Sequence, residues 1–185
     1  MKQFNEVSFK KEYLKELLDS EGFLGTTSSE KLKDSSGFFL GFRKGSVIFD
    51  LEQSLTTFIK VLQLIKGCNA SSAKLLFVGC PHSIEHIVQK ELNESRHAYI
   101  NENSWVLGSL TNYNQSKVRP DLIVTFNRTC TFPSKECFKK DVPLISFVDE
   151  TFDITYVDYP IFVNLKSKGA AKMYYQLIKQ SISNV

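Results

Sequence analysis

The stretch Lys74-Leu75-Leu76-Phe77-Val78-Gly79 decides the fold of this chain. Four consecutive apolar residues before a glycine are typical of a strand that is buried on both faces of a parallel sheet. An apolar stripe at helical spacing precedes this strand. The stripe begins after Asp50, a residue suited to cap a helix, and ends near Gly67. A second stripe begins at about Ser83, and a strand between two helices indicates a βαβ unit.

The alternation of strands and helices continues towards the C-terminus. Further strands are predicted at residues 98–100, 122–126, 144–148 and 157–163. A short helix follows Pro133, and a final helix begins at Ser167. This order predicts an α/β fold of the flavodoxin-like, doubly wound type, in which helices flank both faces of a parallel sheet.

Residues 1–37 differ in character from the rest of the chain. Ser8 is a candidate N-cap, and Gly22 marks the end of a helical repeat formed by Phe9, Tyr13, Leu14, Leu17 and Leu18. Residues 26–37 are rich in Ser, Lys and Asp and lack apolar periodicity, which indicates an extended loop that lies on a partner. We therefore predict an N-terminal helix and docking loop over residues 1–37, and a single α/β domain over residues 38–185.

Two short apolar runs, residues 38–40 and 47–49, flank Arg43-Lys44-Gly45. This arrangement predicts a β-hairpin whose tip carries two cations. The net charge of the whole chain is only +3, from 23 Lys and Arg against 20 Asp and Glu. Any contact with RNA should therefore be local, on one positively charged face.

Composition also indicates the compartment. The four cysteines form neither a C-x-x-C pair nor a dense framework, and we expect reduced, mostly buried thiols. No apolar run reaches the length of about 18 residues that spans a bilayer, and no signal peptide is visible, so we expect a soluble protein without a membrane partner. The N-terminus carries Glu6, Glu12 and Glu16 and no arginine before Arg43, which does not resemble an Arg-rich transit peptide.

The segment His82-Ser83-Ile84-Glu85-His86 matches the zinc motif H-x-x-E-H, with Glu150 as a candidate third ligand. This chemistry requires both imidazoles on one face of a regular helix. Pro81 and the candidate cap Ser83 instead predict that His82 lies in the turn before the helix. We therefore predict no metal site and no catalytic residue, and we interpret Cys80 as a buried thiol rather than as a nucleophile paired with His82.

The turn at residues 79–83 lies where doubly wound folds bind ligands, at the carboxyl end of a strand and the start of a helix. A nucleotide- or flavin-binding module is therefore the alternative function. The chain contains neither G-x-G-x-x-G nor G-x-x-x-x-G-K-S/T, and Pro81 lacks one of the amides that would bind a phosphate. We predict no cofactor and no small-molecule substrate.

Candidate contacts with RNA are cations near turns and one polar segment. The cations that could reach phosphates are Arg43, Lys44, Lys117, Arg119, Lys166 and Lys168. Residues 101–112 place the single tryptophan, Trp105, among polar residues without helical or strand periodicity. Trp105 would stack on a base, pack against a neighbouring protein, or fill a gap in its own domain.

Six short segments occur in a fixed order, and each alone is weak evidence. They are residues 39–45, 47–52, 74–79, 105–112, 119–124 and 157–161. Together they resemble the ribosomal protein S2 family of the small ribosomal subunit, bacterial and organellar type, over residues 22–182. The resemblance implies a protein without catalytic activity. Such proteins bind small-subunit rRNA and neighbouring ribosomal proteins between the head and the body, near the mRNA exit.

We predict nine residues that contact rRNA or neighbouring proteins, the cations through phosphates and the others by stacking or hydrogen bonding. They are Arg43, Lys44, Trp105, Thr111, Asn112, Lys117, Arg119, Lys166 and Lys168.

This chain departs from the family at several expected RNA contacts. Ser104 stands where the family usually has Arg, Leu107 replaces the first Gly of a pair, and Pro81-His82 replaces Lys-Arg. Only residues 113–118 separate Asn112 from Arg119, so the family's projecting helical hairpin is absent. We therefore expect weaker direct binding of rRNA and more contact with proteins. These departures indicate a structural constituent of the mitochondrial small ribosomal subunit, in the matrix, rather than a plastid or bacterial member.

Overall fold

The computed structural model describes residues 6–27, 36–93, 95–112, 119–126 and 131–183 of the 185. Its main sheet has five strands in the order β5-β4-β6-β7-β8, and every neighbouring pair is parallel. The strands are β4 (Leu75–Val78), β5 (Ala98–Ile100), β6 (Leu122–Thr125), β7 (Leu144–Val148) and β8 (Tyr159–Phe162). All residues of β4, β6 and β7 are buried, which explains their mostly apolar sequences. The doubly wound, flavodoxin-like fold predicted from the sequence is confirmed.

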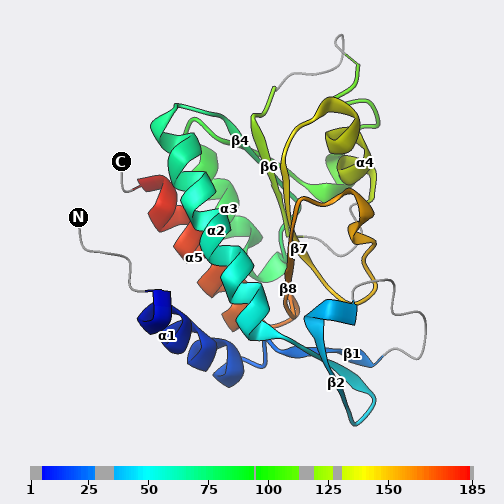
Figure 1. Cartoon of the computed structure of the whole chain (residues 1–185). Coiled ribbons are helices and arrows are strands. Elements are labelled where there is room, and N and C mark those ends of the chain that lie inside the picture. The colour runs from blue at the N-terminus through cyan, green and yellow to red at the C-terminus, as the bar shows by residue number, and fades with distance from the viewer. Residues whose placement is uncertain (1–5, 28–35, 94, 113–118, 127–130, 184–185) are drawn as a thin grey trace.

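Helices cover both faces of this sheet (Figure 1). Helices α2 (Leu51–Ala70), α3 (His82–Asn93) and α5 (Lys168–Ser183) lie on one face, and α4 (Thr131–Lys140) lies on the other. Successive residues of a strand point to opposite faces. Leu75 and Phe77 of β4 accordingly belong to the core under α2, α3 and α5. Leu76 and Val78 belong to the core on the α4 side.

The face that carries α4 is covered partly by irregular chain. Its core cluster consists of Leu76, Val78, Ile123, Cys137 and Leu144. In the described residues, the connection from β5 to β6 contains only one short 3₁₀ helix, η2 (Glu102–Ser104). Trp105 and Leu110 of this connection pack on the cluster. Residues 101–112 thus cover the sheet where a helix would otherwise lie.

A second, antiparallel sheet lies beside the carboxyl ends of β7 and β8. Its strands are β1 (Leu24–Thr27), β2 (Phe39–Arg43) and β3 (Ser46–Phe49), in the order β1-β3-β2. The rings of Phe38 and Phe39 contact Phe162 of β8, with centroids 4.6 and 5.5 Å away. Phe49 of β3 belongs to the same cluster. These rings fix the hairpin to the main sheet, and the hairpin projects at the lower edge of Figure 1.

Helix α1 (Glu6–Asp19) packs against α2 and α5 and buries Leu17 completely. The predicted helix is confirmed, but it begins at Glu6, so Ser8 lies inside the helix and is not its N-cap. Residues 24–27 form β1, so the predicted loop starts with two strand residues. That residues 1–37 dock on a partner stays a prediction.

Burial and length correct two further expectations. Helix α2 does not end at Gly67, which faces open space, but continues to Ala70. Leu18, in the predicted apolar repeat of the first helix, and Ile87, in the apolar stripe that begins near Ser83, are 48% and 39% exposed, so neither lies on an inner face. Neither α2, with 20 residues, nor any other helix of the described part is apolar enough over its length to cross a membrane.

Two helices also begin earlier than expected. His82 is the first residue of α3 and does not precede the helix, because the carbonyl of Pro81 already accepts the amide of Glu85 at 3.1 Å. Helix α4 begins at Thr131, so Pro133 lies in its first turn. A proline is tolerated there because the first amides of a helix have no intrahelical acceptor.

Candidate functional site

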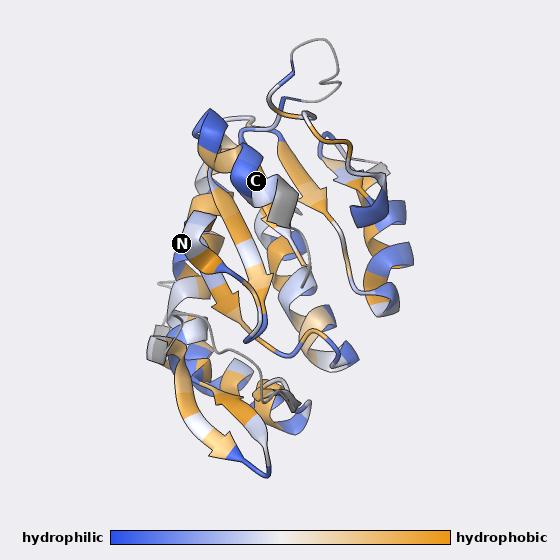
Figure 2. Cartoon of the chain, turned by 90° about the vertical axis from the view of Figure 1, so that its right-hand side faces the viewer, coloured by the Kyte–Doolittle hydropathy of each residue, from blue (hydrophilic) through white to orange (hydrophobic). Residues whose placement is uncertain are grey.

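The tip of the β2–β3 hairpin is a tight two-residue turn. Arg43 pairs with Ser46 across the hairpin, and the intervening Lys44 and Gly45 have φ of 50° and 81°. Positive φ at both positions is typical of a type I′ turn, whose twist matches that of the two strands. Arg43 and Lys44 are exposed, and Phe42 beside them is 62% exposed. Figure 2 shows this hydrophilic tip beyond the apolar strands.

The hairpin is anchored at its base. Asp50 follows β3 directly, and its side chain accepts the amide of Gln53 at 3.1 Å as the N-cap of α2. The amide of Asp50 donates to the carbonyl of Phe38 at 2.8 Å. The predicted hairpin and cap are therefore confirmed, and two exposed cations stand on a fixed support. Such a tip can pair with phosphates, and Phe42 can stack on a base.

The other predicted cations do not form one patch with the hairpin tip. Lys166 and Lys168 are exposed and follow β8, so they lie at the carboxyl edge of the sheet. Arg119 precedes β6 and lies at the opposite, amino edge. Lys166 lines a small cavity together with Phe49, which brings it near the base of the hairpin. Lys117 lies outside the described residues.

Residues 101–112 are held by a buried carboxylate of α4. Glu136 is only 7% exposed, and its Oε1 accepts the amide of Gly108 at 2.9 Å. Its Oε2 accepts the amide of Leu110, also at 2.9 Å. The indole Nε1 of Trp105 donates to Oε1 at 3.4 Å. One side chain thus satisfies three donors of a segment that has no sheet or helix partner of its own.

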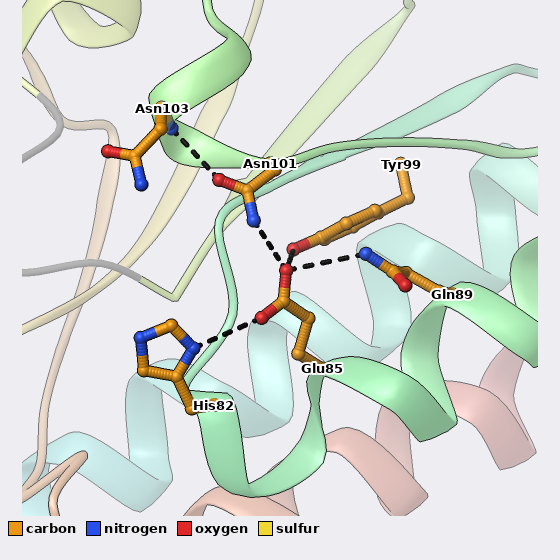
Figure 3. A network of polar contacts seen from close by, with 6 residues as sticks. All are labelled: His82, Glu85, Gln89, Tyr99, Asn101 and Asn103. Carbon is orange, nitrogen blue, oxygen red and sulfur yellow. Dashed lines mark hydrogen bonds and ion pairs between the residues drawn. The ribbon is translucent and has the colours of Figure 1, made fainter.

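A second carboxylate holds the start of the same segment (Figure 3). Glu85 of α3 accepts hydrogen bonds from Asn101 at 2.5 Å and from Tyr99 at 3.0 Å. Nδ1 of His82 lies 3.2 Å from its other oxygen. Burial alone would raise the pKa of Glu85, but the hydrogen bonds from Tyr99, His82 and Asn101 outweigh it and lower that pKa. Oδ1 of Asn101 in turn accepts the amide of Asn103 at 3.0 Å.

Because Glu136 and Glu85 hold the segment in place, they determine which of its side chains are exposed. Trp105 is half-buried on its own core, whereas Val106 and Leu107 are 59% and 62% exposed. Of the other predicted contacts, Thr111 is half-buried and Asn112 is exposed, with its amide donating to Gly108 at 2.7 Å. The nine predicted contact residues include neither the supporting Glu85 and Glu136 nor the exposed Val106 and Leu107; in the sequence Glu85 appears only within the H-x-x-E-H match, and Leu107 only as a replacement for glycine.

A cavity of about 210 Å³ opens at the carboxyl edge of the sheet, where the alternative function would place a ligand. Residues 79–82, 101–103, 126, 165 and 166 line it together with Glu85, so that two acidic residues, Glu85 and Glu102, stand against one lysine, Lys166. This balance of charge does not favour a phosphate group, and the volume lies below the 300 Å³ or so of most ligand pockets. Burial raises the pKa of the Cys80 thiol, so this thiol is not activated as a nucleophile.

Comparisons with known proteins identify the family. The family model described as Ribosomal protein S2 matches residues 17–129 and 113–184. A small ribosomal subunit protein uS2 from Desulfatibacillum aliphaticivorans is 28% identical over 132 residues, covering 68% of this chain and 45% of the relative. The same protein from Leifsonia xyli subsp. xyli is 30% identical over 100 residues, 54% and 33% of the two chains.

The corresponding protein from Chloroflexus aurantiacus is 29% identical over 110 residues, covering 60% of this chain and 46% of the relative. In these comparisons the chain spans less than half the length of the relatives it matches. The two stretches matched by the family model overlap at residues 113–129, from the connection after β5 to just beyond β6, and together they take in nearly all of the chain. The chain therefore belongs to the ribosomal protein S2 family.

Proposed function

We propose that the protein is a structural constituent of the small ribosomal subunit, which binds rRNA and neighbouring ribosomal proteins and so supports translation. The match to the ribosomal protein S2 family over residues 17–184 carries this proposal. The geometry agrees with it, because the exposed features are small protruding elements on a rigid α/β body. Such elements suit assembly into a particle.

In this proposal the hairpin tip is the main contact with RNA. Arg43 and Lys44 are exposed, and Phe42, which precedes them in the chain, is 62% exposed. Cations beside an aromatic ring suit phosphates and unstacked bases. Because the net charge is only +3, the contact is local. Lys166 and Lys168 would extend it along the carboxyl edge of the sheet.

The proposed location is the mitochondrial small subunit, between head and body near the mRNA exit. The departures at Ser104, Leu107 and residues 81–82 support this location, because a mitochondrial member of the family would bind rRNA less and neighbouring proteins more. None of these four positions carries a lysine or an arginine. Asn112, at the end of residues 101–112 (the Trp105 segment), and Arg119, which precedes β6, would also contact neighbours.

Sedimentation tests this function directly. A mitochondrial extract is centrifuged through a magnesium-containing gradient, and fractions are probed for this chain at moderate salt. The expected result is co-migration with the small subunit, and release when magnesium is removed at high salt. A chain that stays at the top of the gradient as a free protein would contradict the proposal.

A nucleotide- or flavin-binding module is the second candidate, favoured only by the position of the 210 Å³ cavity at the carboxyl edge. It is tested on the purified chain with ATP, GTP and FMN by calorimetry. Binding by the free protein, combined with absence from the subunit, would replace the ribosomal proposal. We expect no binding, because the cavity is small and two acidic residues, Glu85 and Glu102, line it with a single lysine.

A further inference from the structure

We propose that Val106 and Leu107 form the tip of a preorganised loop that inserts into an apolar recess, with a neutral or basic rim, on a neighbouring protein of the small subunit. The inference rests on the proposed function, because it names the kind of neighbouring protein that one surface of this chain binds within the small subunit. It concerns a surface separate from the hairpin tip.

The loop is held in one conformation before any partner binds. Glu136 accepts the amides of Gly108 and Leu110, two residues apart in the loop. Glu85 accepts a hydrogen bond from the side chain of Asn101 at the start of the segment. Gly108 has φ of 90°, a conformation that suits glycine. A segment that is already ordered loses less conformational entropy on binding. The tip therefore resembles a rigid anchor rather than a mobile loop.

The exposed side chains at the tip are apolar. Trp105 and Leu110 pack inward on the core of the sheet, whereas Val106 and Leu107 between them are 59% and 62% exposed. Two adjacent large apolar side chains exposed at the tip of an ordered loop are suited to contact with another protein.

Charge distinguishes a protein partner from RNA. Residues 101–112 contain a single charged residue, Glu102, and no Lys or Arg. Nearly all of the affinity of proteins for RNA backbones depends on cations, so this segment offers RNA little and repels its phosphates. An apolar tip in a segment whose one charge is negative instead fits a recess that is apolar inside and neutral or basic at its rim.

Photo-crosslinking in the assembled particle tests the partner. A photoreactive phenylalanine analogue replaces Leu107 in the full chain, and the small subunit is purified before irradiation. A matched probe replaces Ile87 of α3, another exposed apolar residue. We expect one discrete, ribonuclease-resistant adduct with another protein of the subunit from position 107, and not from position 87. A ribonuclease-sensitive adduct, a dimer of this chain or no adduct would overturn the inference.

Occupancy of the subunit gives the second measurement. The double variant V106S/L107S should lower occupancy of the subunit about tenfold in competition with the wild type, since central apolar anchors dominate binding. The control I87S should have no effect, and equal occupancy of V106S/L107S would overturn the inference. A wild-type chain that is absent from the subunit would overturn the proposed function as well. A chain that is present but crosslinks to RNA would overturn only the inference.

Discussion

The hairpin tip and the Trp105 segment are both exposed and both firmly held, but in opposite ways. The hairpin is held by strand pairing, in which Phe42 faces Val47 and Arg43 faces Ser46, and needs no side chain to satisfy its backbone. The Trp105 segment has no strand partner, and side chains of α3 and α4 supply its acceptors. In this protein, side-chain carboxylates accept the amides of irregular chain on a sheet face, whereas a helix would satisfy its own backbone groups.

The same two regions differ in charge, which separates their partners. Arg43 and Lys44 give the hairpin tip two positive charges, whereas residues 101–112 carry one negative charge. Binding through the hairpin should therefore depend strongly on salt, since it displaces counterions from RNA. Binding through Val106 and Leu107 should depend on apolar burial and respond little to salt. This contrast can be tested region by region.

Charge reversal at the hairpin tip should have the largest effect. The double variant R43E/K44E should bind small-subunit rRNA on the order of a hundredfold more weakly at about 0.1 M salt, because two phosphate contacts become repulsive. The negative slope of log affinity against log salt should become shallower by about two. Filter binding over a salt series measures both quantities.

A control of equal charge separates this from a change in net charge. K60E/K90E reverses two exposed lysines on α2 and α3 and should keep the salt slope of the wild type. V106S/L107S should also keep that slope. If R43E/K44E kept the wild-type slope, the hairpin tip would not be a contact with RNA. That result would leave the assignment of the chain to its family unchanged.

Removal of the Glu136 carboxylate should have the next largest effect. In E136A the amides of Gly108 and Leu110 lose their acceptor, which should lower the free energy of unfolding by about 2 kcal/mol. Trp105 is the only tryptophan, so its fluorescence reports on this segment alone. Its emission should shift to longer wavelength, and quenching by acrylamide should increase.

The matched control is K135A, which truncates the exposed neighbour of Glu136 on the same helix. It should leave the emission of Trp105 unchanged. E136A should reduce occupancy of the subunit in the same direction as V106S/L107S, because both remove the ordered apolar tip. Unchanged emission in E136A would show that the indole does not depend on this carboxylate.

Loss of the helix cap at the base of the hairpin should have a smaller effect. D50A removes the acceptor of the Gln53 amide and should cost about 1 kcal/mol of unfolding free energy. The urea midpoint should fall at constant m-value, while the emission of Trp105 in the folded state stays the same. D50S keeps a capping oxygen and should recover most of the loss. A shifted emission in D50A would mean that the two regions are coupled.

The sequence predicts the elements whose residues carry local signals. Strands β4 and β7 match their predicted bounds because four or five consecutive apolar or buried residues leave no alternative face. The sequence predicts the hairpin tip at Arg43-Lys44-Gly45, and the structure narrows the turn to Lys44 and Gly45, because Arg43 is the last residue of β2. The cap at Asp50 was also predicted correctly. Helix ends were less predictable. Gly67 is tolerated within α2 at an exposed position, and Pro133 is tolerated in the first turn of α4.

The support of the Trp105 segment could not be predicted, because its partners are distant in sequence. Glu136 lies 26 to 31 residues from the groups it binds, and Glu85 lies 16 residues from Asn101. A glutamate in an amphipathic helix is ordinarily an exposed residue, and no local pattern marks one that is buried. The exposure of Val106 and Leu107 follows from that support, so it too becomes visible only in three dimensions.

The smallest expected effect tests the other carboxylate through pH. The hydrogen bonds to Glu85 lower its pKa in the folded state below the ordinary 4.5, so its ionised form contributes stability that is complete above pH 4.5. This contribution is lost as pH falls through the folded pKa. E85Q should therefore be less stable than the wild type by under about 1 kcal/mol near neutral pH. The difference should shrink below pH 4.5, whereas the exposed control E12Q should show little difference at either pH. A difference that grew on acidification would mean that Glu85 is held protonated, and the support of Asn101 would then have to come from a neutral acid.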